Sequence, residues 1–238
     1  MKAAPAIGLY DLSFTWPRQP VPALLLDELR IEAGQQVFIS GPSGSGKSTL
    51  LAIIGGIVTP QRGTVSILGQ PLQSLAPGRR DRFRVDHLGF IFQQFNLLPY
   101  LSVIDNVLLP CRFSSTRRNR ALERADGLPQ AARSLLDGLD LAPSLWTRDV
   151  ASLSIGQQQR VAAARALIGR PDIIVADEPT SALDAQRQQG FLDLLQHQCR
   201  QSASALVFVS HDLRLAQRFD TRIALEQVNR AERMQEPA

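Results

Sequence analysis

The chain has 238 residues, of which 44% are hydrophobic and 20% are charged, and its formal net charge is +4. This length accommodates one large α/β domain, and the composition is that of an ordinary globular protein, which excludes a disordered or fibrous chain. The small positive charge gives no reason to predict a nucleic-acid partner.

Cysteine usage and hydropathy indicate a chain that works in a reducing compartment and does not cross a membrane. Cys111 and Cys199 are the only two cysteines and lack the spacing of metal ligands, so we expect no disulfide framework and a cytoplasmic protein. The N-terminal residues MKAAPAIGLYDL lack the apolar core of a signal peptide. The longest apolar stretch, 50–58, is too short to span a bilayer and contains Gly55 and Gly56.

The first hundred residues predict strands and turns with one helix. Segments 7–14 and 24–31 alternate apolar and polar residues, as half-buried strands do. The apolar segment 35–40 predicts a buried strand that leads directly into a glycine-rich loop. A helix is predicted after this loop at 48–57, and further strands are predicted at 64–68 and 88–92.

Residues 97–170 have a helical character. Helices are predicted at 103–109 (ending before Pro110), 118–127, 130–141 and 157–168. Beyond them, strands at 173–176 and 205–210 flank a helix at 185–199. Strands that alternate with helices imply a mostly parallel sheet covered on both faces, with 97–170 inserted between two strands. The last dozen residues are rich in Glu, Arg and Gln and predict a solvated tail.

The loop GPSGSGKST at 41–49 is typical of a phosphate-binding site. Its glycines allow the backbone to turn several N–H groups toward a phosphate, and the helix that follows adds its positive end. Lys47 is expected to reach the β- and γ-phosphates, and the Ser48 hydroxyl to bind Mg²⁺. A glycine-rich turn with an accidental lysine would not account for the complete pattern between a strand and a helix. The predicted nucleotide-binding residues here are Gly41, Ser43, Gly44, Ser45, Gly46, Lys47, Ser48 and Thr49.

Two acidic residues end the apolar strand IIVADE. We expect Asp177 to bind Mg²⁺, directly or through water, and Glu178 to act as the base that orients or deprotonates the attacking water. Two exposed acids at a strand end are common by chance. That alternative is set aside because PTSALD follows and the phosphate loop precedes them.

Five motifs together resemble the ATP-binding cassette (ABC) ATPases: the loop 41–49, the segment around Gln93, LSIGQQQR from 153, VADEPTSALD from 175, and VSHD from 209. The resemblance implies a single ABC ATPase domain over 1–238. Its nucleotide-binding core would be 1–96 with 171–238, including an N-terminal antiparallel β subdomain, and its helical subdomain would be 97–170. It also implies a head-to-tail homodimer that holds two ATP molecules at its interface.

The resemblance further implies roles for residues outside the phosphate loop. Gln93 would contact Mg²⁺ and sense the membrane partner, Asp184 would bridge the two sites of the dimer, and His211 would touch the γ-phosphate. The signature residues Ser154, Ile155, Gly156 and Gln157 would face the ATP of the opposite subunit. Their place at a helix start suits an anion, although Ser154 as a plain helix cap is an alternative, and both can hold together.

Two positions in this resemblance leave alternatives open. Trp16 stands where the family has an aromatic residue that stacks on adenine, with Tyr10 as the competitor and a core role for either as the alternative. Ile155 replaces the first glycine of the usual LSGGQ. If that backbone needs a positive φ, isoleucine is costly, whereas in a first helical turn it is tolerable. We expect activity to be retained.

The segment 89–110 resembles the branch that contains lipoprotein-releasing, macrolide-exporting and cell-division (FtsE-like) ATPases. This implies an Mg²⁺-dependent ATP hydrolase at the inner face of the cell membrane. It would drive a separate permease by mechanotransmission, for export or lipoprotein extraction. A regulatory ATPase that signals to cell-wall remodelling is the alternative. A DNA-repair or translation cassette usually needs a longer chain, and a small-molecule kinase explains neither LSIGQ nor PTSALD.

Two surface features also have alternative readings. The apolar residues Phe92, Phe95, Leu97, Leu98 and Leu101 would line a groove for a permease helix or belong to the core. The arginine-rich segment 114–124 lacks interleaved aromatics, so a solvated helix start is preferred to a nucleic-acid patch, and anionic lipid headgroups are a second use.

Overall fold

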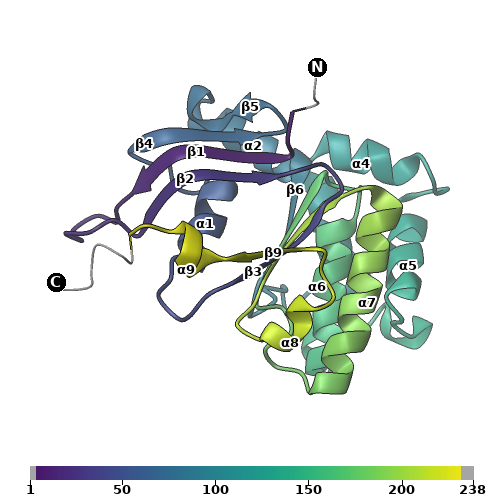
Figure 1. Ribbon diagram of the computed structural model, residues 1–238. Coiled ribbons are helices and arrows are strands. Elements are labelled where there is room, and N and C mark those ends of the chain that lie inside the picture. Colours follow the sequence, from purple (N-terminus) through teal and green to yellow (C-terminus); the bar gives the residue numbers. More distant parts are fainter. Residues whose placement is uncertain (1–3, 232–238) are drawn as a thin grey trace.

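The computed structural model describes residues 4–231, and an antiparallel sheet forms its N-terminal part (Figure 1). The sheet has four strands in the order β2-β1-β4-β5. These are β1 (Ile7–Phe14), β2 (Leu24–Ile31), β4 (Arg62–Ile67) and β5 (Gln70–Pro71). The first two have the predicted bounds. In each, buried apolar residues recur at every second position with one shift of phase in mid-strand, which in β1 coincides with the irregular pairing between Tyr10 and Ser13.

A parallel sheet of five strands, in the order β6-β7-β8-β3-β9, forms the centre of the molecule. Its strands are β3 (Gln36–Ser40), β6 (Leu88–Ile91), β7 (Ile173–Asp177), β8 (Ala205–Val209) and β9 (Thr221–Ala224). All five residues of β8 are buried. Strands covered on both faces are apolar throughout, which is why these segments lack alternation. The predicted mostly parallel sheet is confirmed.

The two faces of the parallel sheet belong to different cores. Val37 and Val207 face helix α1 (Lys47–Ile54) and the antiparallel sheet. Phe38 and Phe208 point the other way and stack with ring centroids 6.1 Å apart. On that side they pack against α6 (Ile155–Leu167) and α7 (Ala185–Ser202). Figure 1 shows α1 and the antiparallel sheet on one side of the parallel sheet, with α6 and α7 on the other.

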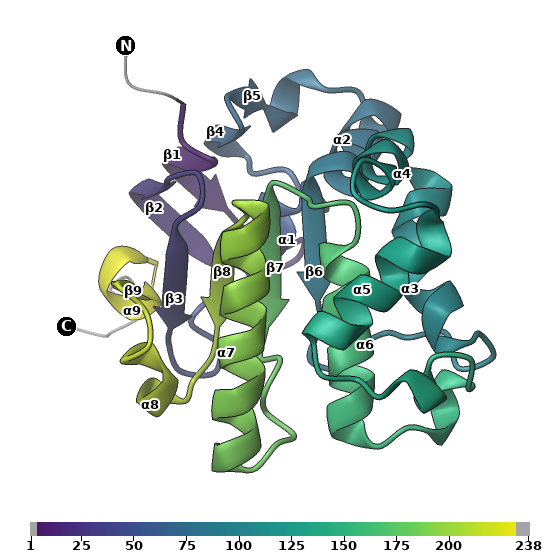
Figure 2. The same ribbon diagram turned by 90° about the vertical axis from the view of Figure 1, so that its right-hand side faces the viewer.

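A block of helices is inserted between β6 and β7, as predicted. It contains α3 (Val103–Phe113), α4 (Ser115–Leu122), α5 (Leu128–Gly138) and α6, and it lies beside the parallel sheet in Figure 2. The remaining helices are α2 (Pro77–His87), α8 (Leu213–Ala216) and α9 (Leu225–Val228), with short 3₁₀ turns at Leu72–Ser74, Pro143–Leu145 and Val150–Ser152. Of the residues that the structure describes, none belong to a helix with the length and apolarity that a bilayer requires.

The predicted end of a helix before Pro110 is wrong, because α3 continues to Phe113. Proline removes one backbone donor, but Val107 and Cys111 lie one turn apart on the same buried face and carry the helix past it. Most other bounds move by no more than three residues, but the helix predicted to end at 127 ends five residues earlier, at Leu122. Thus α6 begins at Ile155 and α4 at Ser115, where the Ser114 hydroxyl accepts a hydrogen bond from the N–H of Arg117 at 2.9 Å.

Two predictions of solvated segments also need correction. Arg117, in the arginine-rich segment 114–124, is only 2% exposed, and its guanidinium donates to the carbonyls of Ile168, Ala166 and Arg165 at the end of α6. Burial lowers the pKa of Arg117 to about 10, so it is still charged at neutral pH. In the predicted C-terminal tail, Asn229 is buried, while 232–238 lie outside the described residues.

Candidate functional site

The phosphate loop follows β3 and runs into α1, as the sequence predicts. Gly44 has φ 88° and Gly46 has φ 96°, a left-handed conformation that favours glycine. Nζ of Lys47 donates to the carbonyl oxygens of Gly41 at 2.6 Å and Pro42 at 2.7 Å. Lys47 therefore links the end of the loop to its beginning, and its ammonium group lies beside the carbonyl oxygens of Gly41 and Pro42.

Neighbouring side chains pack closely against the loop and fix its conformation. A Cβ added at Gly41 would collide with the hydroxyl of Ser45, which is buried without a hydrogen-bond partner of its own. Nδ2 of Asn229 donates to the carbonyl of Ser45 at 3.1 Å. Because a buried backbone carbonyl needs a partner, Asn229 fixes the loop from the C-terminal segment. No sequence pattern identified this residue.

The carboxyl edge of the parallel sheet brings the two acids to the loop. Asp177 is the last residue of β7 and Glu178 follows it. Burial raises the pKa of Asp177, the charge of Glu178 raises it further, and the Lys47 ammonium opposes the rise. This electrostatic coupling links the strand end to the phosphate loop.

Glu178 is held by the end of the neighbouring strand β8. Its φ is 46°, an uncommon value for a residue other than glycine, and its N–H donates to the carbonyl of Val209 at 2.9 Å. The Glu178 carboxylate accepts from the backbone N–H of His211 at 3.0 Å, and Nδ1 of His211 lies 2.9 Å from both of its oxygens. The hydroxyl of Ser210 adds a longer contact of 3.3 Å. The strained backbone thus turns Glu178 toward His211. A positive φ at a residue other than glycine often occurs at functional sites.

The Glu178–His211 pair borders a cavity of about 460 Å³, which Thr180, Ser181, Gln188 and Arg214 also line. The glutamate side chain is only 13% exposed, whereas the imidazole is 69% exposed. A nearly buried carboxylate beside an exposed imidazole can accept a proton on its cavity side and be held in place by the imidazole.

Gln93 lies two residues beyond β6, whose last residue, Ile91, pairs with Ala176 of β7. This register brings the turn that contains Gln93 near Asp177. The guanidinium of Arg165, in α6, donates to the carbonyls of Asn96 (2.6 Å) and Phe95. Arg165 therefore ties the Gln93 turn to the signature helix, a link between positions 70 residues apart that no motif predicts.

The signature residues form the start of α6. The hydroxyl of Ser154 accepts from the N–H of Gln157 at 3.4 Å, and the Gln157 side chain accepts from the N–H of Ser154 at 2.9 Å. This reciprocal pair is a capping box, so the plain-cap reading of Ser154 is correct as a structural description. Ile155 is the first helical residue and is exposed, and in Figure 2 this end of α6 lies to one side of the strand ends.

The remaining predicted residues lie at other element ends. Trp16 is 39% exposed, and its Nε1 donates to the hydroxyl of Thr49 in α1 at 3.0 Å. Its competitor Tyr10 packs over Gly8 within β1. Asp184 caps α7 by accepting from the N–H of Arg187 at 3.0 Å. The structure thus brings Trp16, the loop 41–49, Asp177, Glu178 and His211 to one region. The signature helix lies against the segment that follows Glu178, where Gln159 donates to the carbonyl of Pro179 at 2.6 Å.

The donors in this region fit Mg²⁺ with a bound nucleotide. The Ser48 hydroxyl, the Gln93 amide and the Asp177 carboxylate are hard oxygen ligands. Among the described residues, no cluster of three or more His, Cys, Asp or Glu could hold a metal by itself. A site with one carboxylate and few protein ligands is what Mg²⁺ uses when phosphate oxygens complete its coordination.

A glycine loop between a strand and a helix, with acids at the carboxyl end of another strand of the same parallel sheet, defines a P-loop nucleotide hydrolase. Comparison with known proteins identifies the family of hydrolase to which the chain belongs. The ABC transporter family model matches residues 26–181. The uncharacterized ABC transporter ATP-binding protein YbbA of Escherichia coli is 44% identical over 193 residues, 81% of each chain. The lipoprotein-releasing system ATP-binding protein LolD of Pseudomonas fluorescens is 36% identical, over 91% of this chain and 93% of that one.

A solved structure supports the same conclusion. The dimeric structure of MJ0796, a bacterial ABC transporter cassette, has a TM-score of 0.76 at 36% identity and covers 92% of this chain and 95% of its own. The same cassette in a post-hydrolysis state bound to ADP and Pi also has a TM-score of 0.76. The chain belongs to the ABC transporter family and is an ATP-hydrolysing, ATP-binding subunit, so the predicted resemblance is confirmed.

Proposed function

We propose that two copies of this chain bind two ATP molecules between them, head to tail, and drive a separate membrane permease. The dimeric MJ0796 cassette supports the dimer. In each copy the core would be 1–96 with 171–238 and the helical subdomain 97–170. The chain would work in the cytoplasm, at the inner face of the membrane, where the permease holds it.

The loop and an aromatic residue would bind ATP. The N–H groups of the loop and the Lys47 ammonium would bind the phosphates, and the positive φ of Gly44 and Gly46 supports this role. Trp16 would stack on adenine, which its exposed ring and its contact with Thr49 support. Ser48, Gln93 and Asp177 would hold Mg²⁺, which when bound neutralises phosphate charge.

Glu178 would be the general base for hydrolysis. It would orient water beside the γ-phosphate and take a proton as the water oxygen attacks phosphorus, and ADP with inorganic phosphate would leave. His211 would hold the carboxylate and touch the γ-phosphate. The observation that supports this role most directly is that His211 and Ser210 hydrogen-bond to the nearly buried carboxylate of Glu178.

The signature would complete the site from the partner copy. Ser154, Ile155, Gly156 and Gln157 stand at the start of a 13-residue helix, whose free N–H groups and dipole favour an anion. In a head-to-tail dimer this helix start would face the γ-phosphate of the other copy, with Asp184 between the two sites.

The permease would be of the mechanotransmission type, in which ATP-driven closure of the dimer moves an extracytoplasmic domain. Relatives at 36–39% identity are named as ATP-binding proteins of a lipoprotein-releasing system, which favours export or lipoprotein extraction. A regulatory ATPase that signals to cell-wall remodelling is the alternative. Stimulation of ATP turnover by the permease encoded beside this gene, and the class of that permease, would separate the two.

Glu178→Gln tests the proposal. It removes the base but keeps the side-chain shape, so we expect hydrolysis to fall by about 10²- to 10⁴-fold while ATP still binds. With saturating ATP-Mg, light scattering should show a stable dimer of this variant. If the variant stays monomeric under these conditions, the proposed ATP clamp is wrong for the isolated chain. If it hydrolyses ATP at the native rate, the assignment of Glu178 is wrong.

A further inference from the structure

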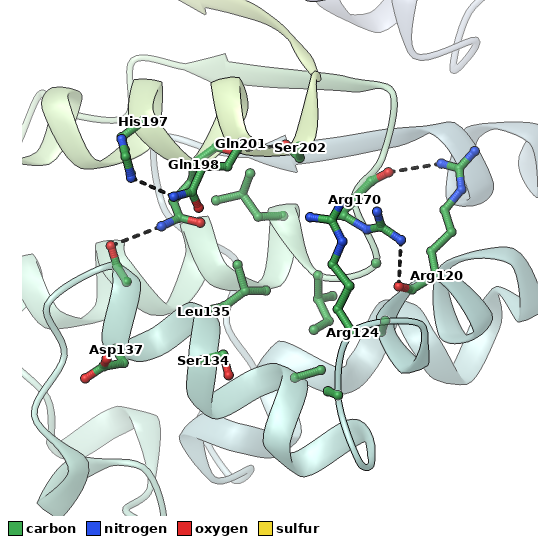
Figure 3. A pocket seen from close by; sticks show the side chains of 17 residues that line it. Arg120, Arg124, Ser134, Leu135, Asp137, Arg170, His197, Gln198, Gln201 and Ser202 are labelled. Atoms are coloured by element: carbon green, nitrogen blue, oxygen red, sulfur yellow. Dashed lines mark hydrogen bonds between the residues drawn. The ribbon is translucent and has the colours of Figure 1, made fainter.

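A cavity of about 390 Å³ lies between the helical insertion and α7, far along α6 from the signature residues. Its walls come from the ends of α4, α5, α6 and α7, as Figure 3 shows. Leu167–Arg170, which line it, lead into the amino end of β7, whereas Asp177 and the phosphate loop lie at the opposite end of that strand. The cavity is therefore separate from the site of hydrolysis.

Three guanidinium groups line one side of this cavity. Arg120 donates to the carbonyl of Arg170 at 3.0 Å and pairs with Asp172 at 3.1 Å. Arg170 donates to the carbonyl of Arg120 and pairs with Glu123. Arg124 is exposed and, within the described part of the chain, has neither a hydrogen bond nor an ion pair. Two of the three guanidinium groups are thus paired with a carboxylate, and that of Arg124 is not.

The position of Arg124 makes this charge available to a ligand. In Figure 3 its side chain rises from the end of α4 and its guanidinium points toward that of Arg170. Asp137, another charged residue of the lining, lies on the far side of the cavity. Two neighbouring guanidinium groups repel each other, so an anion between them would be stabilised by both.

The rest of the cavity suits an apolar body. Its walls include the side chains of Ala121, Ala125, Ala131, Leu135, Leu167 and Ile168. The polar groups at the far end are already engaged: Gln201 lies 2.8 Å from the His197 ring, and Gln198 donates to the carbonyl of Gly138 at 3.3 Å. The volume lies toward the lower end of the range for small-molecule sites, about 300–1,000 Å³, which suits a small ligand.

We infer that this cavity binds a medium-chain organic carboxylate, with the carboxylate at Arg124 and Arg170 and the hydrocarbon against the alanine and leucine side chains. One unpaired guanidinium group matches a monoanion better than a phosphate group, which carries a charge of about −1.5 to −2 at neutral pH. Such a ligand would contact the helical insertion and α7 of the core together. The inference does not rest on the proposed function.

Decanoate is the probe, because it combines one carboxylate with an unbranched hydrocarbon chain. Calorimetric titration of the full chain, with decanoate below its micelle concentration, should show saturable binding at one site. Arg124→Gln should weaken this binding by about tenfold or more, since it removes a charge-assisted hydrogen bond. Ser134→Trp fills the cavity from an exposed position of its lining and should abolish binding.

Arg118→Gln is the matched control, because Arg118 is an exposed arginine of α4, six positions before Arg124, and does not line the cavity. Its decanoate affinity should equal that of the native chain, and decanol should bind at least about tenfold more weakly than decanoate. The inference is overturned if the native chain shows no saturable binding, or if Arg124→Gln binds like the native chain. It is also overturned if decanol or inorganic phosphate binds as tightly as decanoate.

Discussion

Ile155 is the residue at which this chain departs from the LSGGQ sequence, and its backbone explains why the change is tolerated. It is the first residue of α6, lies outside the left-handed region and has a side chain that is 54% exposed. A β-branched residue at a helix start costs little, and the exposed side chain crowds nothing buried. The alternative in which this position requires a positive φ is therefore wrong.

We predict that Ile155→Gly changes ATP turnover by less than about threefold. Gly lowers helix stability by roughly 0.5–1 kcal/mol relative to ordinary residues, and urea unfolding should show a loss of this size. Steady-state ATP hydrolysis of the two proteins, measured side by side, tests the prediction. A gain of two orders of magnitude would mean that isoleucine impairs the native site.

The two cysteines should not react in the folded protein. Cys199 in α7 is fully buried and burial raises its pKa to about 12, while Cys111 in α3 is 3% exposed and burial raises its pKa despite Arg117 nearby. The thiolate is the reactive form, and a thiol with that pKa is about one part in ten thousand ionised at pH 8.

We therefore expect no reaction of native protein with a chromogenic disulfide reagent over minutes at pH 8, and reaction of both thiols once guanidinium unfolds the chain. Asn119→Cys places a thiol at an exposed position of α4 and should add one equivalent immediately. Rapid labelling of the unaltered native chain would contradict the burial of one of its cysteines.

At the scale of elements, Asn229 joins the C-terminal segment to the first sheet and to the phosphate loop. Its Oδ1 accepts from the N–H of Leu25 at 2.9 Å, and its Nδ2 donates to the carbonyls of Ala23 and Ser45, each at 3.1 Å. Asn229→Ala leaves these backbone groups without their partner. A buried unsatisfied group costs about 1–3 kcal/mol, so we predict that the free energy of unfolding falls by about 2–4 kcal/mol.

Denaturant unfolding measures this loss, and Asn119→Ala supplies the control. It removes the same amide from an exposed helical position and should change stability by less than about 0.5 kcal/mol. Equal stability of the Asn229→Ala and Asn119→Ala variants would show that the C-terminal segment does not support the loop.

The elements that the sequence predicted well are those whose own residues determine them. Strands β7 and β8 are short apolar runs between turn signals. In β1 and β2 the apolar residues alternate with one shift of phase, so the local pattern sufficed to predict all four. Arg117 and Arg118 are adjacent and identical in kind, yet only Arg117 is buried, because the carbonyls at the end of α6 lie over that position. Which of the two arginines is buried depends on tertiary packing, and no local sequence pattern indicates it.

The same division holds for the site. The residues of the loop 41–49 and the pair Asp177–Glu178 are contiguous motifs next to strand ends, so their proximity follows from the parallel sheet. The contact of Arg165 with the turn at Phe95 and Asn96 spans 70 positions and belongs to no motif. Asn229 contacts Leu25 across 204 positions. Side chains that fix a site from a distance could not be predicted from one sequence.

At the scale of the whole molecule, the signature helix and the phosphate loop of one chain make no complete site. Ser154 and Gln157 hydrogen-bond to each other, while Lys47 bonds to its own loop. In the proposed head-to-tail dimer each site would take its loop from one copy and its signature from the other, so a defect in one motif would affect only the site that uses it.

Two inactive variants should therefore restore activity when mixed. Lys47→Ala removes the loop lysine. Gly156→Asp adds a negative charge where the partner's phosphate would bind, and an added Cβ at Gly156 meets only Leu183 at 3.7 Å, so the helix should form normally. In an equal mixture about half of the dimers are mixed, and each mixed dimer has one intact site of two. If each site hydrolyses ATP independently, the mixture should recover about a quarter of native turnover.

A chain that carries both substitutions, mixed with either single variant, should recover none. A mixture of the two single variants that stays inactive, although cross-linking detects mixed dimers, would contradict the shared sites.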